Sequence, residues 1–350
     1  MTVGHAIWPD QLTDDERACL RPGPPEQLDR SPRVLIVGGG MLGLATAAAC
    51  VRAGPGSVVV IERDWLGAGA SGGAAGLLMP EAHDGVDPPA LVDLARLSLE
   101  AWRELDQSWP GGVGLMEVQW SGHRQARVNP LRAIARVAAH LPCVIGGVEA
   151  RAVAIEGGRV GSVQTTIGEM RPDNVVFATG RPPRIDGLEV SVPASEVKGH
   201  MLVTEPTALQ PPAAMVLLAR SIEDGRLMIG GTLDVGDEER VVRPQVIATM
   251  LAELEAAWPA AHGLSVAYQW ACFRPAHPDL LPVIDRVPSL SNAWMTSGHY
   301  KTGILMAPAT GRALAEWIRS GEQPPEVRAF AVDRLLALSK SATQGGLDSH

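Results

Sequence analysis

Apolar residues are most continuous between residues 33 and 78 of this 350-residue chain. Val34 to Val37 form a short aliphatic run that ends abruptly at three glycines, and residues 42–52 have the composition of an apolar helix. A second aliphatic run, Ser57 to Ile61, closes on Glu62. Short unbroken runs are typical of buried strands. The pattern therefore predicts a strand, a tight turn, a helix and a second strand.

The predicted turn carries Gly38, Gly40 and Gly43 in the spacing G-x-G-x-x-G. In a nucleotide-binding turn the first glycine permits the bend, the second lets a pyrophosphate approach, and the third lets helix pack against strand. The phosphates then lie at the helix N-terminus. Such turns also occur without a ligand, but Glu62 stands where a carboxylate binds an adenosine ribose. The sequence predicts FAD or NAD, because this acid disfavours the 2′-phosphate of NADP.

The segments that follow predict further elements of both kinds. Residues 67–76 are small, and such a run brings backbone close to a second part of the cofactor or to a crowded core. After Pro88 and Pro89, a helix is expected whose apolar face is core, namely Leu91, Leu94, Leu97, Trp102 and Leu105. We further predict a strand at 111–120, a helix from 129 to 140, a hairpin within 143–166 and a buried strand at 175–178.

From residue 198 onward the pattern changes to short strands. They are predicted at 201–204, 215–218, 227–231 and 265–273, with one helix at 244–258. Strands grouped in this way favour a second, antiparallel layer that covers the cofactor. A last buried strand at 292–296 precedes a helix to Ile318, in which Pro308 is tolerable only near the first turn.

The composition of the chain limits the classes of molecule that it is expected to bind. The net charge of −9 and a pI near 5.5 argue against nucleic acid or an anionic membrane, since either requires a basic face. The four cysteines are far apart, so we expect no disulfide and no metal site, and Cys50 on the first helix is expected to be a small buried hydrophobe. No stretch predicts a membrane span or a signal peptide, and a cytoplasmic location is the default expectation.

Six motifs can now be considered together: GGGMLGL with Glu62, ASGGAAGLL, VVFATG, VKGHMLV, FRPAHPDLLPVI and GHYKTGILMAPATG. In that order they resemble the FAD-dependent D-amino-acid oxidase superfamily, most closely its glycine oxidase and sarcosine oxidase branch. The resemblance covers roughly residues 33–335 and selects FAD over NAD. It implies an α/β fold, with a Rossmann-like FAD-binding domain of the glutathione-reductase type and a smaller, mostly antiparallel β substrate domain.

The resemblance also implies domain boundaries. The FAD-binding domain is expected to be discontinuous, at 31–110, 130–195 and 285–336, and the substrate domain to comprise 111–129 and 196–284. Residues 1–30, rich in proline and acids, are expected to form an irregular arm that is disordered or packs Trp8 on the domain, and 337–350 a polar tail.

By this resemblance the cofactor contacts can be assigned along the chain. Met41 and Leu42 are expected at the pyrophosphate, and Glu62 with Arg63 at the adenosine end. The remaining cofactor residues are Ala70, Ser71, Ala75, Gly76, Leu77, Ala150, Thr179, Gly180, His299, Tyr300, Lys301, Thr302, Gly303, Ile304 and Leu305. The last seven are expected under the flavin, where backbone N–H groups at a helix start stabilise negative charge on the reduced ring.

Relatives of this kind oxidise a C–N bond by moving hydride from the substrate α-carbon to flavin N5, so no catalytic side chain is expected. The resulting imine is hydrolysed, and O2 reoxidises the flavin to give hydrogen peroxide. Arg274 matches the family's carboxylate clamp, since a guanidinium offers two parallel donors. A solvated arginine at a strand end is the alternative interpretation.

Three departures from the family pattern affect the substrate. Lys301 and Thr302 replace an Arg-Asn pair, Leu218 replaces a tyrosine, and residues 114–129 replace a much longer segment. We therefore expect a more open pocket and a substrate, an amine or amino acid, larger than glycine.

Two other functions remain open. One is a dehydrogenase that passes electrons to a quinone or a partner subunit, and the other is a non-catalytic flavin-binding subunit. A homo-oligomer is compatible with each. Four histidines, none in a base–nucleophile spacing, are weak candidates for proton acceptors: His83, His123, His200 and His277.

Overall fold

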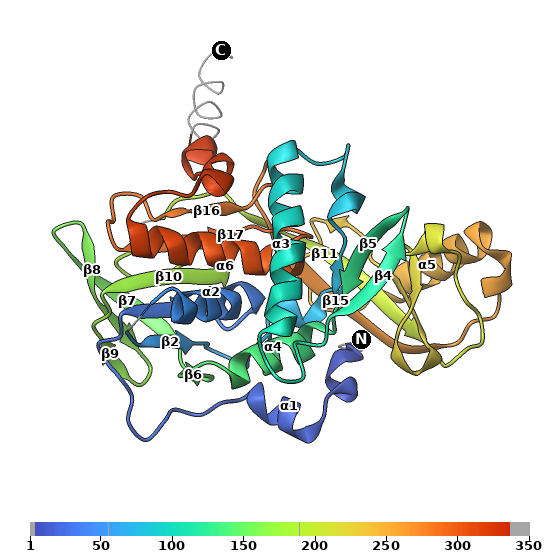
Figure 1. Ribbon diagram of the computed structural model, residues 1–350. Helices are drawn as coiled ribbons and strands as arrows, with labels where there is room; N and C mark the ends of the chain where they lie inside the picture. Colours follow the sequence, from blue (N-terminus) through green and yellow to red (C-terminus); the bar gives the residue numbers. More distant parts are fainter. Residues whose placement is uncertain (1–3, 55, 189, 337–350) are drawn as a thin grey trace, which may run out of the picture.

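The computed structural model describes residues 4–54, 56–188 and 190–336 (Figure 1). The predicted tail at 337–350 and the first three residues of the predicted arm lie outside these ranges. Among the described helices, none is long and apolar enough to cross a membrane.

A six-stranded sheet forms the left half of the molecule in Figure 1, and the chain enters it from both ends. Its spatial order is β16 (Val283–Arg286), β17 (Ala293–Ser297), β10 (Asn174–Gly180), β1 (Val34–Val37), β2 (Val58–Ile61) and β6 (Val144–Ile145). All neighbours are parallel except β16 and β17. This is the predicted nucleotide-binding sheet, and the predicted α/β fold is confirmed.

The two faces of this sheet are covered differently, as the alternation of side chains along β1 shows. Val34 and Ile36 face a helical layer of α2 (Met41–Arg52), α6 (Gly303–Ser320) and α4 (Pro130–Ala139). Leu35 and Val37 face a three-stranded sheet of β7 (Ala150–Glu156), β8 (Arg159–Thr165) and β9 (Gly168–Met170). Both faces are therefore buried, which explains the unbroken aliphatic runs.

Pro308 lies in the second turn of α6, deeper than the sequence suggested was tolerable. A proline cannot donate to the carbonyl four residues earlier, here that of Ile304. The indole Nε1 of Trp102, on α3 (Pro89–Gln107), donates to the Ile304 carbonyl at 3.1 Å. Ser98 on the same helix accepts from the Ala309 amide at 3.1 Å. Helix α3 thus satisfies the groups that the proline leaves unpaired.

The predicted antiparallel layer is confirmed in the right half of Figure 1. Its strands are β11 (Ser195–Thr204), β12 (Ala219–Ser221), β13 (Leu227–Gly230), β14 (Asp234–Val235) and β15 (Val266–Ala276). β11 pairs with β15 on one side and with β13 and β14 on the other. Helix α5 (Pro244–Ala257) packs Ile247 and Met250 against Leu202 and Ile229 of this sheet.

Three local predictions require correction. Residues 215–218 are no strand: the 3₁₀ helix η4 (Ala213–Met215) ends there, and a turn follows before β12 begins at Ala219. Leu97 is 54% exposed and lies outside the core face of α3. The strand expected at 111–120 is only β4 (Met116–Trp120), which forms a hairpin with β5 (His123–Arg127) and a small sheet with β3 (Leu77–Leu78).

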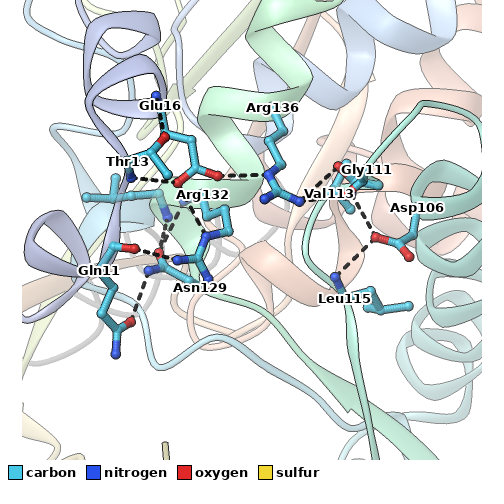
Figure 2. Close-up of polar contacts among 12 residues, drawn as sticks. Gln11, Thr13, Glu16, Asp106, Gly111, Val113, Leu115, Asn129, Arg132 and Arg136 are labelled. Atoms are coloured by element: carbon cyan, nitrogen blue, oxygen red, sulfur yellow. Dashed lines mark hydrogen bonds and ion pairs between the residues drawn. The ribbon is translucent and has the colours of Figure 1, made fainter. Parts of the chain in front are cut away.

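The described part of the N-terminal arm, residues 4–30, packs on the domain. It contains η1 (Trp8–Gln11) and α1 (Asp14–Cys19), and Trp8 is buried. Its indole donates to the Ala74 carbonyl at 2.9 Å. Figure 2 shows Glu16 between Arg132 and Arg136 of α4, with the Arg136 contact at 2.8 Å. The arm is thereby fixed to the helix that begins at the predicted cap, Asn129.

Asp106, also in Figure 2, orders the link from α3 to β4 by accepting the amides of Val113 and Leu115. The remaining described 3₁₀ helices are η2 (Ala70–Gly73), η3 (Pro80–His83), η5 (Glu223–Gly225), η6 (Pro259–Ala261) and η7 (Pro325–Phe330).

Candidate functional site

A cavity of about 960 Å³ lies between the carboxyl ends of β1, β2 and β10 and the antiparallel sheet. This size and position are typical of ligand sites in open α/β sheets. A second hollow of about 530 Å³, beside the β16–β17 turn, contains none of the predicted site residues.

The three glycines of the turn have three different surroundings. Gly38 has a φ of +119°, which favours glycine. A Cβ on Gly43 would lie 1.9 Å from the Gly38 carbonyl oxygen, so the third glycine is needed for packing. A Cβ on Gly40 would instead point toward the cavity, with Ser71 Oγ as its nearest neighbour at 3.2 Å. Only the second glycine leaves room for a ligand.

Glu62 is held in a fixed orientation at the end of β2. One carboxylate oxygen accepts from the Gly39 amide at 2.7 Å, and the other from the Asp64 amide at 3.0 Å. A carboxylate has about four acceptor positions, so two bonds leave capacity for two hydroxyl groups. This arrangement fits a ribose at the cavity wall.

The segment 70–77 is anchored from several directions. Ser71 Oγ accepts from the Met41 amide at 3.2 Å, and the Gly73 carbonyl accepts from the indole of Trp270 at 3.0 Å. The Ala75 carbonyl accepts from Arg220 at 2.8 Å. Burial, with a smaller contribution from Arg127, lowers the pKa of Arg220 to about 9. These contacts hold a wall of small side chains against the cavity.

The segment 298–305 joins the two sheets at the start of α6. The Gly298 amide donates to the Gly180 carbonyl at the end of β10, and the Tyr300 amide donates to the Pro275 carbonyl on β15, each within 2.9 Å. His299 follows the last parallel strand and lines the cavity. The first N–H groups of α6 have no partner within the helix, and its first three residues, Gly303, Ile304 and Leu305, line the cavity.

His299 is a buried, neutral group. Its Nε2 lies 2.8 Å from Thr296 Oγ1, whereas Nδ1 has no hydrogen-bond partner among the residues that the structure describes. Burial, aided by the nearby His277, lowers the pKa of His299 to about 3. The imidazole can therefore exchange a hydrogen bond with a ligand but carries no charge near neutral pH.

Arg274 lies on β15 opposite Val197, and its guanidinium packs over the backbone of Gly199. One nitrogen donates to the Thr232 carbonyl at 2.9 Å. The side chain lines the cavity and forms no ion pair with any described carboxylate. A half-buried cation without a counter-ion is suited to an anionic ligand.

Lys301 is an exposed cation at the same cavity, with its ammonium 5.8 Å from the ring centre of Tyr300. Leu218 does not line the cavity, because the 3₁₀ turn directs it toward the core of the antiparallel sheet. Its neighbour Leu217 lines the cavity instead and is 48% exposed.

Most of the predicted residues are brought together at this one cavity, and four are not. Besides Leu218, the side chain of Met41 is buried in the helical core, and Gly43 serves packing. Thr302 is buried and donates its hydroxyl to the His299 carbonyl at 2.8 Å. The predicted residues that line the cavity are Gly38, Gly40, Leu42, Glu62, Arg63, Ala70, Ser71, Ala75, Gly76, Leu77, Ala150, Thr179, Gly180, Arg274, His299, Tyr300, Lys301, Gly303, Ile304 and Leu305.

The lining residues that the sequence interpretation did not name include Leu217, Leu233 and Arg240. Leu233 and Arg240 belong to the connection between β13 and α5, residues 231–243, which includes the two-residue strand β14 and is called the loop 231–243 below. A run of charges at 237–240 was the available signal, but it resembles any solvated loop.

Three of the four candidate histidines have hydrogen-bond partners within the protein, and the fourth is exposed. His200 is buried, with Nδ1 2.8 Å from Asp234, and His277 contacts Pro193 and Ser297. His83 lies at the cavity edge, 2.6 Å from Asp87, and His123 is exposed.

The four cysteines are free, and burial raises the pKa of Cys50 to about 12, as expected of a buried hydrophobe. In the described part of the chain no His, Cys, Asp and Glu side chains cluster as metal ligands would.

Comparison with known proteins identifies the family. The protein-family model described as FAD dependent oxidoreductase matches residues 33–139 and 120–317 of this chain. The glycine oxidase of Pseudomonas aeruginosa is 30% identical over 361 residues, covering 84% of this chain and 96% of that protein.

Two solved structures share the fold. The glycine oxidase of Geobacillus kaustophilus has a TM-score of 0.74 at 21% identity, with 87% of this chain and 99% of that chain covered. The L-proline dehydrogenase of P. horikoshii has a TM-score of 0.75 at 18% identity, with 89% and 99% covered.

Proposed function

Because the chain belongs to the FAD-dependent oxidoreductase family, we propose that it oxidises the C–N bond of an amino acid or amine that is larger than glycine. FAD is its cofactor. Relatives in the same comparison include a glycine oxidase and a D-amino acid dehydrogenase, which supports nitrogen compounds as the substrate class.

The observation that carries this proposal is the placement of Arg274. Its guanidinium lacks a counter-ion among the described carboxylates and lines the cavity beside the start of α6. The link is direct, because the Tyr300 amide donates to the carbonyl of the next residue on β15, Pro275. A carboxylate held by Arg274 therefore lies next to the segment expected under the flavin.

Bound FAD supplies the acceptor of a hydride from the substrate carbon. The chain itself binds and orients. Arg274 fixes the carboxylate, and the N–H groups at the start of α6 stabilise negative charge at the edge of the cofactor. Lys301 adds a mobile positive charge, which tolerates more than one carboxylate position.

A substrate larger than glycine is supported by the apolar side chains at the cavity. Leu217 and Leu233 are 48% and 57% exposed, and both line it. Burying apolar surface contributes about 25 cal/mol per Å², so two or three methylene groups outweigh one hydrogen bond of about 1 kcal/mol.

The length of the chain also supports a more open pocket and a larger substrate. The match to the Pseudomonas aeruginosa enzyme spans 361 residues but takes in 84% of this chain, so that enzyme carries extra residues opposite gaps here. The two stretches matched by the family model overlap at residues 120–139, a range that begins within the β4–β5 hairpin. We place the shortened cover at this hairpin.

The test is an anaerobic titration of purified protein that has been loaded with FAD. A panel of amino acids and secondary amines is added, and loss of the visible absorption band of the oxidised flavin is followed. Loss of the band followed by stoichiometric peroxide on admitting O2 supports an oxidase. Loss of the band without peroxide, but with dye reduction, supports a dehydrogenase. Bound FAD that no compound reduces contradicts the proposal.

A further inference from the structure

The loop 231–243 forms one edge of the cavity and carries its own ionic network. Lys198, whose side chain is fully buried on β11, lies 2.8 Å from Asp237. Arg243 contacts Asp237 at 3.0 Å and Glu239 at 2.9 Å. These ion pairs hold the pKa of Asp237 far below its usual range, with Arg243 as the largest contributor. Two acids of the loop are thus neutralised by Lys198 and Arg243.

Arg240, between these residues in sequence, is left without a partner. It lines the cavity, its guanidinium lies 5.6 Å from the ring centre of Phe273, and it forms no ion pair with a described residue. A cation over an aromatic face is held in place without losing its hydrogen-bond donors. Arg240 is therefore a positioned cation with free donors.

The acids that line the same cavity do not neutralise it, because each already has partners. Glu62 accepts two backbone amides, and Asp64 pairs with Arg63 at 3.2 Å. The two others, Glu149 and Glu196, pair with Arg151 and Arg181 at 3.5 and 3.4 Å.

Arg240 and Arg274 act on the same part of the cavity. Phe273, beneath Arg240, directly precedes Arg274 on β15. Both guanidinium groups also oppose the effect of burial, which raises the pKa of the Cys272 thiol. Two arginines without an ion pair among the described residues thus lie near Cys272, a residue of the cavity wall on the antiparallel sheet.

We propose that Arg240 binds a second anionic group of the substrate, so that the preferred substrates are amino acids or N-substituted amino acids with two carboxylates. Arg274 takes the carboxylate next to the reacting carbon, and Arg240 takes the distal one. This inference rests on the proposed function and names the substrate class of that site.

Binding tests this inference without turnover. The FAD-loaded protein is titrated calorimetrically with dicarboxylates from malonate to adipate and with the monocarboxylate of each matching length. We expect at least one dicarboxylate to bind about tenfold or more tightly than its match, as charge-assisted pairs do. Arg240→Gln should remove that difference, and Arg240→Lys should keep part of it. Equal binding of both series by the wild type, or an unchanged preference in Arg240→Gln, overturns the inference.

Steady-state kinetics provides a second, independent test of the role of Arg240. In the wild type we expect kcat/KM for glutamate, tested as both enantiomers, to exceed that for glutamine, and Arg240→Gln should lower only the glutamate value. Arg319→Gln is the matched control for net charge, since Arg319 is exposed and pairs with Glu316 on α6. An equal loss in that control overturns the assignment to Arg240. If no amine reduces the flavin, the proposed function fails, whereas the dicarboxylate titration still decides the role of Arg240.

Discussion

The two walls of the cavity differ in what lines them. On the cofactor side the lining consists largely of backbone and small side chains, such as Gly40, Ala70 and Gly76. On the substrate side it consists of long side chains on a strand and a loop, including Arg240, Arg274 and Leu233. The first wall presents fixed backbone groups, which suit a ligand of constant shape. The second wall is held by side-chain networks, so its specificity can change while the sheet stays the same.

The largest expected effect separates packing from binding within the cofactor wall. Gly43→Ala should prevent stable folding, because its Cβ would lie 1.9 Å from the Gly38 carbonyl oxygen. Gly40→Val should fold, since the φ of −79° and ψ of 177° at Gly40 suit any residue, but it should lose FAD. Circular dichroism and the flavin absorbance of purified protein test both variants. If the Gly40→Val protein retains FAD, the pyrophosphate does not bind against Gly40.

The next effect concerns the support behind the cofactor wall. Trp8→Ala should destabilise the protein by about 3–5 kcal/mol, as truncations of buried aromatic residues do. Trp8→Phe keeps most of the ring but loses the hydrogen bond to the Ala74 carbonyl, and should cost about 1 kcal/mol. Urea unfolding of the FAD-loaded variants measures both. Wild-type stability in Trp8→Ala would show that the arm is dispensable.

On the substrate wall, Arg274→Ala should raise KM by about 10- to 150-fold, equivalent to about 1.5–3 kcal/mol for a lost charge-assisted contact. The flavin spectrum should stay unchanged, because Arg274 belongs to the antiparallel sheet. Arg274→Lys should recover part of the loss, since it keeps the charge without the fork. Steady-state kinetics with one carboxylate substrate is sufficient. An unaltered KM would place the clamp on another residue.

The last effect appears only on acidification and concerns His299, which lines the cavity at the start of α6. The unfolded chain takes up a proton below about pH 6.5, whereas folded His299 stays neutral down to about 3. The contribution of His299 to the free energy of unfolding is therefore fully present above about pH 6.5 and falls as the pH drops toward 3. Between pH 7 and 5 the expected loss is about 2 kcal/mol.

Replacing His299 with Gln should remove this share of the pH dependence in urea unfolding. The control is His262→Gln, because His262 is 84% exposed. An equal pH dependence in wild type and His299→Gln would mean that the folded imidazole is protonated.

The contrast between the walls also explains what the sequence could predict. The glycine turn, Glu62 and the start of α6 lie at the cavity as predicted, because neighbours in sequence determine their positions. The position of Leu218 was missed by one residue, since residues 215–218 form a turn rather than a strand and the alternation of faces is lost.

Arg240 was not predictable for a different reason. Its lack of an ion pair depends on Lys198, far away in the sequence, which together with Arg243 occupies Asp237 and Glu239. The arm is a similar case. The partners of Trp8 and Glu16 lie near Ala74 and on α4, far from both in sequence.

The most direct test of the central claim is a comparison of kcat/KM for glycine, sarcosine and a series of larger amino acids and secondary amines. A substrate wall that exposes Leu217 and Leu233 beside its arginines predicts that kcat/KM for the larger compounds exceeds kcat/KM for glycine. If glycine is best by tenfold or more, another part of the chain closes the pocket, and the account of the substrate wall is wrong.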